Sequence, residues 1–516
     1  SSSAGAAICE VTTLGTNAGA ATWASPVDLQ TALDDPTCTE IWVKAGTYKP
    51  TTADSDPRMA TFLVQRTVAV AIYGGFAGNE TQRDARSPAT HPTILSGDIG
   101  IPGDNSDNSY HVVYMDGTLA NESITASTVL DGFTISDGNA NAGNPENSGG
   151  GLYCNGQSAT HRCSPTLSNL VFSGNHAGYG GALYNYGHNR GNSSPILSNV
   201  VFSGNSATYV GAMYNDGSQG TSSPVLNNVT FNGNSATNFA GAMYNDGTQG
   251  ASSPTLNNVT FSGNIAGTFG GAMYFDGAYG SGGPILNDVT FSANTSSSGG
   301  GAMYSSCNTG NCSPMLSNVT FSGNTAGTFG GAMFNEGYNG ILTPILNNVT
   351  FSGNSANLYG GAIFNSASGS STGNASPTLS NVILWGDSLP IGAVGPEIYN
   401  DPGAGIANPG IDHSVVQGSG GSVSWDTTLG TDGGGNIDAD PMLGALADNG
   451  GATLTRSPGV GSSAIDTGDD GVCGNPQVHG VDQRGVTRPQ GAHCDIGAVE
   501  YVPDLIFADG FDGPPI

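Results

Sequence analysis

Acidic side chains recur at a fixed interval through the centre of the chain. Asp216, Asp246 and Asp276 stand 30 residues apart, and Asp288 and Glu336 lie in the same region. Hydrolysis of a glycosidic bond needs two carboxyl groups, about 5 to 9.5 Å apart, one of which protonates the leaving oxygen. A repeated turn also places an aspartate at a fixed interval, and we expect this structural role here. We therefore predict no catalytic residue.

A loop near residue 100 is rich in oxygen ligands. It contains Asp98, Asp104, Asn105, Asp107 and Asn108. Carboxylate and amide oxygens suit Ca²⁺, so Asp98, Asp104 and Asp107 form a candidate calcium site, and we expect no other cofactor. The loop does not follow the EF-hand pattern, and a solvated acidic turn is the alternative. The same two interpretations apply to a second acidic group: Asp432, Asp438 and Asp440.

Tyrosines also recur with the same interval. In Met273-Tyr274 the two side chains of an extended segment point to opposite faces, so an inward methionine predicts an outward tyrosine. A stripe of exposed rings beside Asn and Asp would suit a sugar or a protein partner. The alternative is that the rings pack under the Asn-Asp-Gly loops that follow them. The candidate binding stripe consists of Tyr184, Tyr214, Tyr244, Tyr274 and Tyr304, with Phe334 and Phe364 in register.

A repeat of 29 or 30 residues positions all of these side chains. Its clearest copy, Pro254 to Tyr274, reads proline, one residue, Leu-Asn-Asn-Val-Thr-Phe-Ser-Gly-Asn, a variable stretch and Gly-Gly-Ala-Met-Tyr. Such a period indicates a solenoid, in which each unit stacks on the next. The apolar residues form short extended runs separated by turn formers. With 82 glycines in 516 residues, helical repeats fit poorly. We predict an all-β fold, a right-handed parallel β-helix.

In a parallel β-helix each position of the repeat becomes a ladder along the axis, with neighbours about 4.8 Å apart. We expect three interior ladders and one corner ladder of asparagines. The first is Leu167, Leu197, Leu226, Leu256, Leu286, Leu316 and Leu346, and the second is Phe172, Phe202, Phe231, Phe261, Phe291, Phe321 and Phe351. The third is Leu183, Met213, Met243, Met273, Met303, Met333 and Ile363. The corner ladder is Asn169, Asn199, Asn228, Asn258, Asn318 and Asn348.

Charge excludes several classes of partner. The chain has 40 acidic residues against 11 Lys plus Arg, a formal net charge of −29, and no Lys or Arg between Arg190 and Arg456. Nucleic acids and anionic lipids both need clustered basic residues, so we expect neither as a partner. The repeats also lack the cationic base that elimination from an acidic polysaccharide needs. No segment approaches the ~20 apolar residues of a membrane-spanning helix.

Eight cysteines fall into close pairs without the spacing of a zinc site. An even number of cysteines in a chain of this composition is typical of disulfides formed in an oxidising compartment. We expect a secreted or cell-surface protein whose signal peptide has been removed. The predicted disulfides are Cys9–Cys38, Cys154–Cys163, Cys307–Cys312 and Cys473–Cys494.

Composition divides the chain into five parts. A solenoid needs atypical ends that cover its first and last apolar layers, and 28–33 reads as a short capping helix followed by a strand at 40–48. Beyond 385 the period is lost and Gly, Asp and Pro dominate. We expect an N-terminal cap and first coil at 1–65, irregular coils at 66–164, regular repeats at 165–385, a loop-rich module at 386–503 and an acidic aromatic tail at 504–516.

Several short segments of the sequence resemble known families. The segments 72–81, 93–98, 109–113 and 130–135 resemble the entry coils of bacterial right-handed parallel β-helix repeat proteins. The signatures Phe-x-x-Asn, as in Phe172 with Asn175, and Gly-Gly-Ala-Leu at 180–183 are similar to the repeats of chlamydial polymorphic outer membrane proteins. Ser-Ala-Ile-Asp at 463–466, Asp-Gln-Arg-Gly at 482–485 and Asp-Ile-Gly-Ala-Val-Glu at 495–500 resemble the choice-of-anchor Q module.

The resemblance implies an exported bacterial surface protein, and the chlamydial relatives are adhesins. We therefore expect a non-catalytic secreted or cell-surface protein that serves in adhesion or as an extracellular scaffold. Its partner would be a host or neighbouring-cell surface, met through a glycan or a protein. One alternative is a subunit of an extracellular filament, because the end coils of a solenoid expose strand edges that can associate along the axis. Another is a polysaccharide-binding or polysaccharide-cleaving β-helix enzyme.

Overall fold

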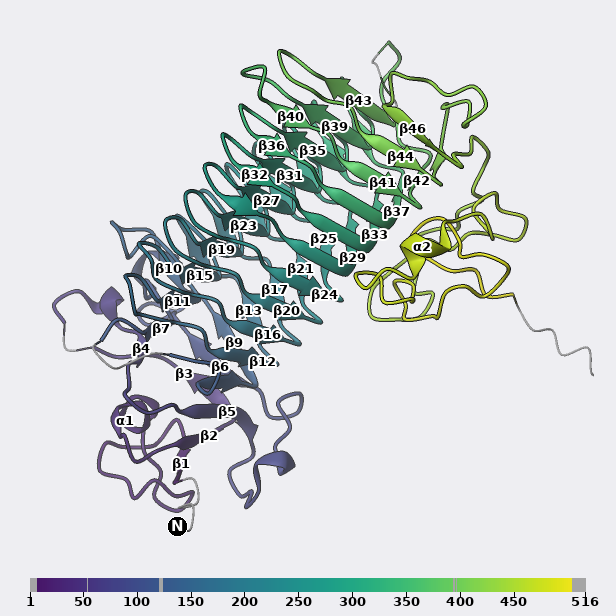
Figure 1. The fold of residues 1–516 in the computed structure, drawn as a ribbon. Coiled ribbons are helices and arrows are strands. Elements are labelled where there is room, and N and C mark those ends of the chain that lie inside the picture. The colour runs from purple at the N-terminus through teal and green to yellow at the C-terminus, as the bar shows by residue number, and fades with distance from the viewer. Residues whose placement is uncertain (1–6, 53, 120–123, 393–394, 396, 504–516) are drawn as a thin grey trace, which may run out of the picture.

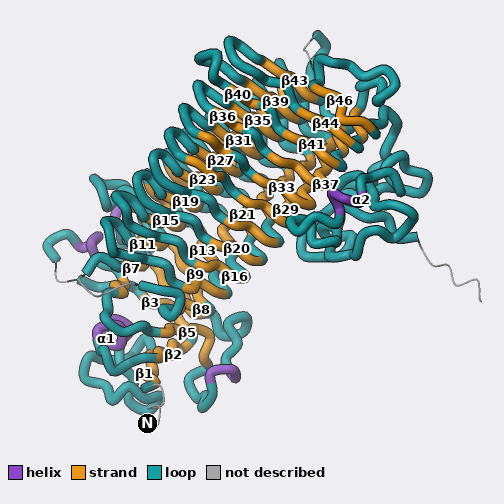
Figure 2. The backbone as a smooth tube through the Cα atoms, viewed as in Figure 1, coloured by secondary structure: helices purple, strands orange, loops and turns teal. Residues whose placement is uncertain are grey.

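A computed structural model describes residues 7–52, 54–119, 124–392, 395 and 397–503. The chain forms one long stack of coils in which strands of successive coils pair in parallel (Figures 1 and 2). The predicted all-β parallel solenoid is therefore confirmed. The acidic aromatic tail expected at 504–516 lies outside the described residues. No helix in the described part of the chain is long and apolar enough to cross a membrane.

The N-terminal end is capped as expected. Helix α1 (Leu29–Asp34) begins after Asp28, whose Oδ1 accepts the Thr31 backbone N–H at 3.0 Å. Its residues Leu29, Ala32 and Leu33 are buried and cover the interior of the first coil. The strands of this region and of the irregular coils are β1 (Ile8–Val11), β2 (Glu40–Lys44), β3 (Gly46–Tyr48), β5 (Ala71–Phe76), β6 (Thr93–Ser96), β8 (Val129–Asp131) and β9 (Phe133–Ser136).

The largest sheet carries the Leu and Phe ladders. In the earlier repeats a corner asparagine divides each coil's contribution into two strands, and Asn258 there has a φ of 56°. The split pairs are β12 (Thr166–Ser168) and β13 (Val171–Ser173), β16 (Ile196–Ser198) and β17 (Val201–Ser203), β20 (Val225–Asn227) and β21 (Thr230–Asn232), and β24 (Thr255–Asn257) and β25 (Thr260–Ser262). The later coils have continuous strands: β29 (Ile285–Ser292), β33 (Met315–Ser322) and β37 (Ile345–Ser352).

A second sheet carries the Leu/Met ladder and the tyrosines. Its strands are β4 (Phe62–Val64), β7 (Val113–Asp116), β11 (Leu152–Asn155), β15 (Leu183–Tyr186), β19 (Met213–Asp216), β23 (Met243–Asp246), β27 (Met273–Asp276), β31 (Met303–Ser306), β35 (Met333–Glu336), β39 (Ile363–Ser366) and β43 (Ile398–Asp401). A third sheet of two-residue strands runs from β10 (Asn139–Ala140) through β14 (His176–Ala177), β18 (Ser206–Ala207), β22 (Ser235–Ala236), β26 (Ile265–Ala266), β30 (Thr295–Ser296) and β34 (Thr325–Ala326) to β38 (Ser355–Ala356). A short fourth sheet pairs β28 (Ser281–Gly282), β32 (Asn311–Cys312), β36 (Ile341–Leu342) and β40 (Asn374–Ala375).

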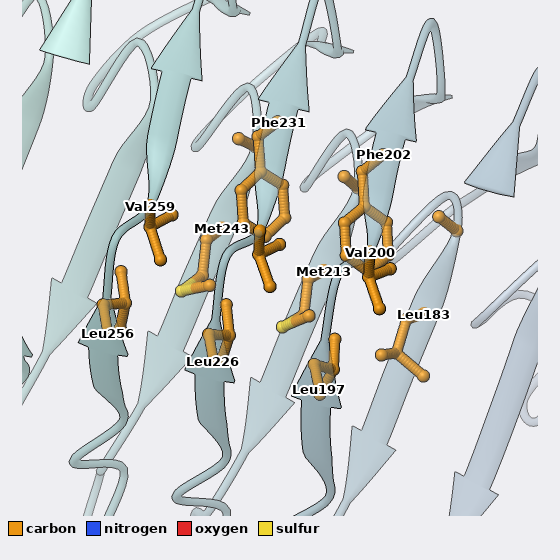
Figure 3. Close-up of a cluster of buried hydrophobic side chains, with 14 of the residues drawn as sticks. Leu183, Leu197, Val200, Phe202, Met213, Leu226, Phe231, Met243, Leu256 and Val259 are labelled. Atoms are coloured by element: carbon orange, nitrogen blue, oxygen red, sulfur yellow. The ribbon is translucent and has the colours of Figure 1, made fainter. Parts of the chain in front are cut away.

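The three interior ladders form as predicted. The Leu, Phe and Met members are fully buried, and Figure 3 shows several of them in successive coils. Phe231 and Phe261 stack with ring centroids 4.8 Å apart and an interplanar angle of 4°. Nearly parallel aromatic rings at this centroid distance attract one another. The corner asparagines also bond along the axis, since Asn199 Nδ2 donates to Asn169 Oδ1 at 3.2 Å.

The Phe-x-x-Asn signature forms a further ladder inside the coils. Asn264 is fully buried. Its Nδ2 donates to Asn294 Oδ1 at 2.9 Å and to the Phe231 carbonyl at 3.0 Å. Each amide therefore satisfies the next, as buried polar groups require. The members are Asn175, Asn205, Asn234, Asn264, Asn294, Asn324 and Asn354.

The Gly-Gly-Ala signature has a steric cause. Gly270 has a φ of +65°, and a Cβ there would lie 2.3 Å from the Met273 carbonyl oxygen. A Cβ on Gly271 would lie 2.0 Å from the Gly301 carbonyl oxygen of the next coil. Glycine tolerates the left-handed conformation at the first position. The second position is fixed by the close approach of the neighbouring backbone.

The C-terminal part corrects two expectations. The coils do not end at residue 385, because β41 (Thr378–Ser380) pairs with β44 (Gly410–Asp412), which pairs with β46 (Thr431–Gly434). The strands β42 (Ile383–Leu384) and β45 (Val415–Val416) continue the same sheet. The loop-rich module that follows does not close the end of the stack either. It lies along its side, with α2 (Asp470–Cys473) near β37 (Figure 1).

The last coil is instead covered by the loop between β45 and β46. Leu429 of this loop is buried and Trp425 packs against the main core. The loop follows no repeat, so the sequence pattern offered no sign of its capping role. Because this loop covers the end of the stack, the module does not cap it and packs instead against the outer face of β29, β33 and β37.

Candidate functional site

Each repeated aspartate is held by the tyrosine of the preceding coil and by its own turn. The Tyr184 hydroxyl donates to Asp216 Oδ2 at 2.8 Å, and the Ser218 backbone N–H donates to Asp216 Oδ1 at 3.1 Å. Burial raises the pKa of Asp216 above its usual value. The same pattern joins Tyr214 to Asp246 and Tyr244 to Asp276 at 3.1 and 3.3 Å, and the Tyr304 hydroxyl donates to Glu336. In each aspartate Oδ2 accepts from the tyrosine of the preceding coil, and Oδ1 accepts from a backbone N–H of its own turn.

Asp288 lies elsewhere, on the outer face of β29. Its Oδ1 accepts from Asn318 Nδ2 at 3.2 Å, and burial raises its pKa to about 6. The Asp288 carbonyl oxygen accepts from the Thr453 hydroxyl of the C-terminal module. Asp288 therefore belongs to the contact between the coils and the module, and it is not part of the aspartate column.

The tyrosine stripe is not an exposed surface. The rings do lie outside the Met ladder, but they stack on one another, with centroids of Tyr244 and Tyr274 4.6 Å apart. A second aromatic row packs over them, and the Phe269 ring lies 4.7 Å from that of Tyr304. Only 8% of Tyr244 and 4% of Tyr304 is exposed. The expectation of an exposed binding stripe is wrong, because aromatic residues five positions before Tyr184, Tyr214, Tyr244 and Tyr274 form the second row. Tyr304 has Gly299 at that position and is covered by Phe269 instead. Tyr214 and Tyr274 are half-buried.

The candidate calcium loop uses its oxygens for turns. Asp104 Oδ1 accepts the Ser106 N–H at 2.9 Å at the start of a 3-10 turn (Asn105–Asp107). Asp107 Oδ2 accepts the Ile101 N–H at 2.7 Å, and Asp98 Oδ2 lies 3.6 Å from Lys49 Nζ. Among the described residues no three His, Cys, Asp or Glu side chains are grouped so as to hold a metal ion. Calcium binding here stays a prediction.

The second acidic group is also engaged in the backbone around it. Asp432 Oδ1 accepts from the Ser422 hydroxyl, the Gly434 N–H and Asn436 Nδ2 at 2.8 to 2.9 Å. Asp438 accepts two glycine N–H groups, and Asp440 accepts the Met442 N–H. These carboxylates order the last coil and the start of the module.

All four predicted disulfides are present, and no cysteine is free. Cys307–Cys312 packs with Phe275 and Leu342 in a small core of its own, outside the main ladders. A third row of buried asparagines bonds along the axis on the second sheet, where Asn215 Nδ2 donates to Asn245 Oδ1 at 2.8 Å. Phe275 occupies the next position of this row. Phe275 thus interrupts this row of asparagines at the coil where the Cys307–Cys312 loop adds apolar contacts.

A buried pair of carboxyl groups ends the Phe-x-x-Asn ladder. Asp387 takes the place of the next asparagine, and its Oδ1 accepts from Asn354 N–H and Nδ2 at 2.6 and 2.7 Å. Glu397 lies beside it and is 1% exposed. Burial raises the pKa of Asp387 to about 6, and burial followed by the charge of Asp387 raises the pKa of Glu397 well above its usual value. Two buried carboxyl groups this close together favour a state in which one of them is protonated.

This pair predicts a pH-dependent stability. Because the folded-state pKa values are raised, the stabilisation is complete below about pH 4.5 and is lost as the pH rises through the folded pKa values. We expect Glu397→Gln, which cannot ionise and keeps the size of the side chain, to raise the urea midpoint at pH 7.5 and to change it little at pH 4. The variant's pH profile should be flatter than that of the wild type.

The control for this prediction is Asp84→Asn, at an exposed carboxyl whose side chain is 88% accessible. It should leave the slope of stability against pH unchanged. If Glu397→Gln keeps the wild-type slope between pH 4 and 7.5, the buried pair does not share a proton.

The C-terminal module is built around its motif residues. The Arg488 and Glu500 side chains are 0% and 1% exposed, with Nη1 and Oε2 3.2 Å apart. Arg488 also donates to the carbonyl oxygens of Asp495 and Gly497 at 2.7 Å. The Gly497 N–H donates in turn to the Asn381 carbonyl of the coils at 2.9 Å.

Gln483 attaches the module to the repeat. Its Oε1 accepts from the Thr320 hydroxyl at 2.6 Å, and its Nε2 donates to Thr290 Oγ1 at 2.8 Å. Ile496 and Ala464 pack on Ile383 and Val415 further along. Thr290 and Thr320 belong to a column of outward residues that is threonine from Thr230 to Thr350. Val171 and Val201 precede these threonines in the column, and Ile383 follows them. No periodic pattern in the sequence pointed to this contact.

The stacked ladders, paired registers and local disulfides define the protein as a parallel β-solenoid repeat protein. Its repeats resemble those of a known family: the Chlamydia polymorphic membrane protein repeat matches residues 169–186 and 348–366. No curated protein matches the chain.

Two solved structures resemble the model at low sequence identity. The crystal structure of pectate lyase Pel9A has a TM-score of 0.45 and 14% identity over 96% of both chains. The complex structure of XylC with xylose has a TM-score of 0.43 and 11% identity over 96% of this chain and 98% of that one. Neither likeness carries an argument about function.

Proposed function

We propose that this chain is a non-catalytic secreted or cell-surface protein that serves in adhesion or as an extracellular scaffold. The observation that carries the proposal is the engagement of the repeated carboxylates. A glycosidase needs one carboxyl group free to protonate the leaving oxygen and another free to act as base or nucleophile. Asp216, Asp246 and Asp276 instead accept hydrogen bonds from a tyrosine and from a turn N–H.

Two further observations support an extracellular location. Four disulfides suit an oxidising environment. The repeats resemble those of a family named for a membrane protein of Chlamydia. Stacked coils with engaged polar ladders give a long, stiff rod, which suits the display of a binding surface away from a cell.

Product release from polysaccharides separates this proposal from the enzymatic alternative. We expect the purified full chain to release no new reducing ends and no unsaturated products from a panel of acidic and neutral polysaccharides. The matched variant is Asp246→Asn, which removes the carboxylate and keeps its shape. Turnover by the wild type that disappears in Asp246→Asn would establish the enzyme and overturn the proposal.

A further inference from the structure

Two arginines differ from all the others in the described structure. Arg58, Arg66, Arg83, Arg86, Arg456, Arg484 and Arg488 each donate from the guanidinium group to a protein oxygen. Arg162 and Arg190 make no such bond to any described residue, and both are exposed. A guanidinium group offers five donors in a planar fork that matches a carboxylate or a sulfate. As far as the described part of the chain extends, both guanidinium groups are therefore open to an external ligand.

Both arginines line the same hollow. It has a volume of about 340 Å³ and is lined by Thr125, Thr160, His161, Arg162, Arg190 and Asn192. Arg190 also lines a neighbouring hollow of about 460 Å³, together with Ala159, Asn189, Gln219 and Gln249. Neither hollow is lined by a described carboxylate. Together they form a polar trough that extends along the axis over several coils.

The turn row, defined as Arg190, Gln219, Gln249 and Tyr279, continues this trough. Each residue has a positive φ, between 54° and 67°, and occupies the tip of its turn. The tips are fixed in line, because the Arg190, Gln219 and Gln249 N–H groups donate to the turn of the next coil at 2.7 to 2.9 Å. Successive side chains therefore project at the coil spacing of about 4.8 Å. Tyr279 is 59% exposed and adds a ring face.

The acidic residues of the same turns do not oppose an anion in the trough. Asp216 and Asp246 are turned towards Tyr184 and Tyr214 and the turn N–H groups. The net charge of −29 is screened over about 8 Å at physiological ionic strength, so the local groups decide what binds. Guanidinium, amide and phenol groups in a row supply donors for both acidic groups and hydroxyls.

We propose that Arg162, Arg190 and the turn row bind an acidic polysaccharide, one that carries carboxylate or sulfate groups, with its chain along the solenoid axis. The inference rests on the proposed function and names the class of ligand that the surface takes. An extended glycan matches a row of rigid, evenly spaced polar side chains with one exposed ring. An acidic peptide would be expected to use more apolar contacts than this trough offers.

The test is titration calorimetry of the full chain with polygalacturonate, chondroitin sulfate, neutral dextran and polyglutamate. We expect binding to an acidic polysaccharide that weakens with added salt, and none to dextran. Each of Arg162→Gln and Arg190→Gln should weaken binding about tenfold or more, since a hydrogen bond to a charged group contributes about 1.5 to 3 kcal/mol. Polygalacturonate carries carboxylates alone, whereas chondroitin sulfate carries both carboxylates and sulfates, so binding to chondroitin sulfate without binding to polygalacturonate points to the sulfate group. The control Arg83→Gln removes an exposed arginine that pairs with Asp84 and should bind as the wild type does.

Three results would overturn the inference. These are no binding to either acidic polysaccharide, wild-type affinity in the double variant Arg162→Gln/Arg190→Gln, and equal binding of polyglutamate through the same arginines. The two side chains donate to no residue of the described ranges, so the variants should keep the wild-type denaturation midpoint. Any of these three results would leave the proposed function intact. Polysaccharide turnover that depends on Asp246 would overturn the proposed function and leave the binding result standing.

Discussion

Replacing Phe261 with alanine is expected to lower the free energy of unfolding by about 3 to 5 kcal/mol. The ring is fully buried and stacks on Phe231 and Phe291, with centroids 4.8 Å away on both sides. Its removal opens a cavity in the middle of a continuous column, and the coils above and below cannot close it because their spacing is fixed by the strand ladders. Chemical denaturation of the full chain measures the loss.

Thr260→Ala is the matched control for this change. Thr260 adjoins Phe261 on the same strand and points outward, and a surface substitution of this kind is expected to stay within about 0.5 kcal/mol. Equal losses in the two variants would show that the inward and outward faces of the strand are assigned incorrectly.

The second large effect is expected at Arg488 in the C-terminal module. Arg488→Met leaves the Glu500 carboxylate buried without its partner, which costs about 3 to 5 kcal/mol. The segment that Arg488 holds also contacts the coils, through the Gly497 N–H and through the Ala498 N–H bond to Thr350 Oγ1 at 3.0 Å. We expect the module to unfold and leave the coils, exposing the outer face of β37.

Limited proteolysis followed by mass spectrometry measures this release. Cleavage should appear between residues 438 and 503 in Arg488→Met, while the coils remain protected. Arg83→Met is the control, since the exposed Arg83–Asp84 pair contributes about 1 kcal/mol or less. Cleavage of the module at the wild-type rate would show that the buried ion pair does not hold it.

The repeat made most of the solenoid predictable, because its period specifies both the stacking and the inward face. Phe261 recurs at one position of the seven regular repeats, and Met273 stands at a position that is Met, Leu or Ile in all of them, so their burial follows from the pattern. The exposure of Tyr274 does not follow, because the period-two rule gives the direction of a side chain and says nothing of a second row packed over it. The Phe-x-x-Asn signature showed that Asn264 recurs in each repeat. It did not show that the amide lies inside the coil, where it bonds to the asparagine of the next coil.

Other features had weaker signals or none. Asp387 follows Leu384 at the same spacing as Asn354 follows Phe351, so the sequence could have shown that Asp387 ends the Phe-x-x-Asn ladder. Nothing in the sequence predicts that Asp387 lies beside Glu397. The side-on position of the module depends on single contacts such as Gln483 with Thr320, which no period specifies. Arg190 was visible as the last basic residue before a long stretch without Lys or Arg, but the hollow that it shares with Arg162 forms only when the coils stack.

Immunogold electron microscopy of intact cells that make the protein tests the central claim most directly. The protein is expected outside the cell, so gold particles should decorate the surface or the surrounding matrix of unpermeabilised cells. An antibody raised against the full chain and a strain that lacks the protein provide the control for specific labelling. Labelling that appears only after the cells are permeabilised would contradict an extracellular adhesin or scaffold.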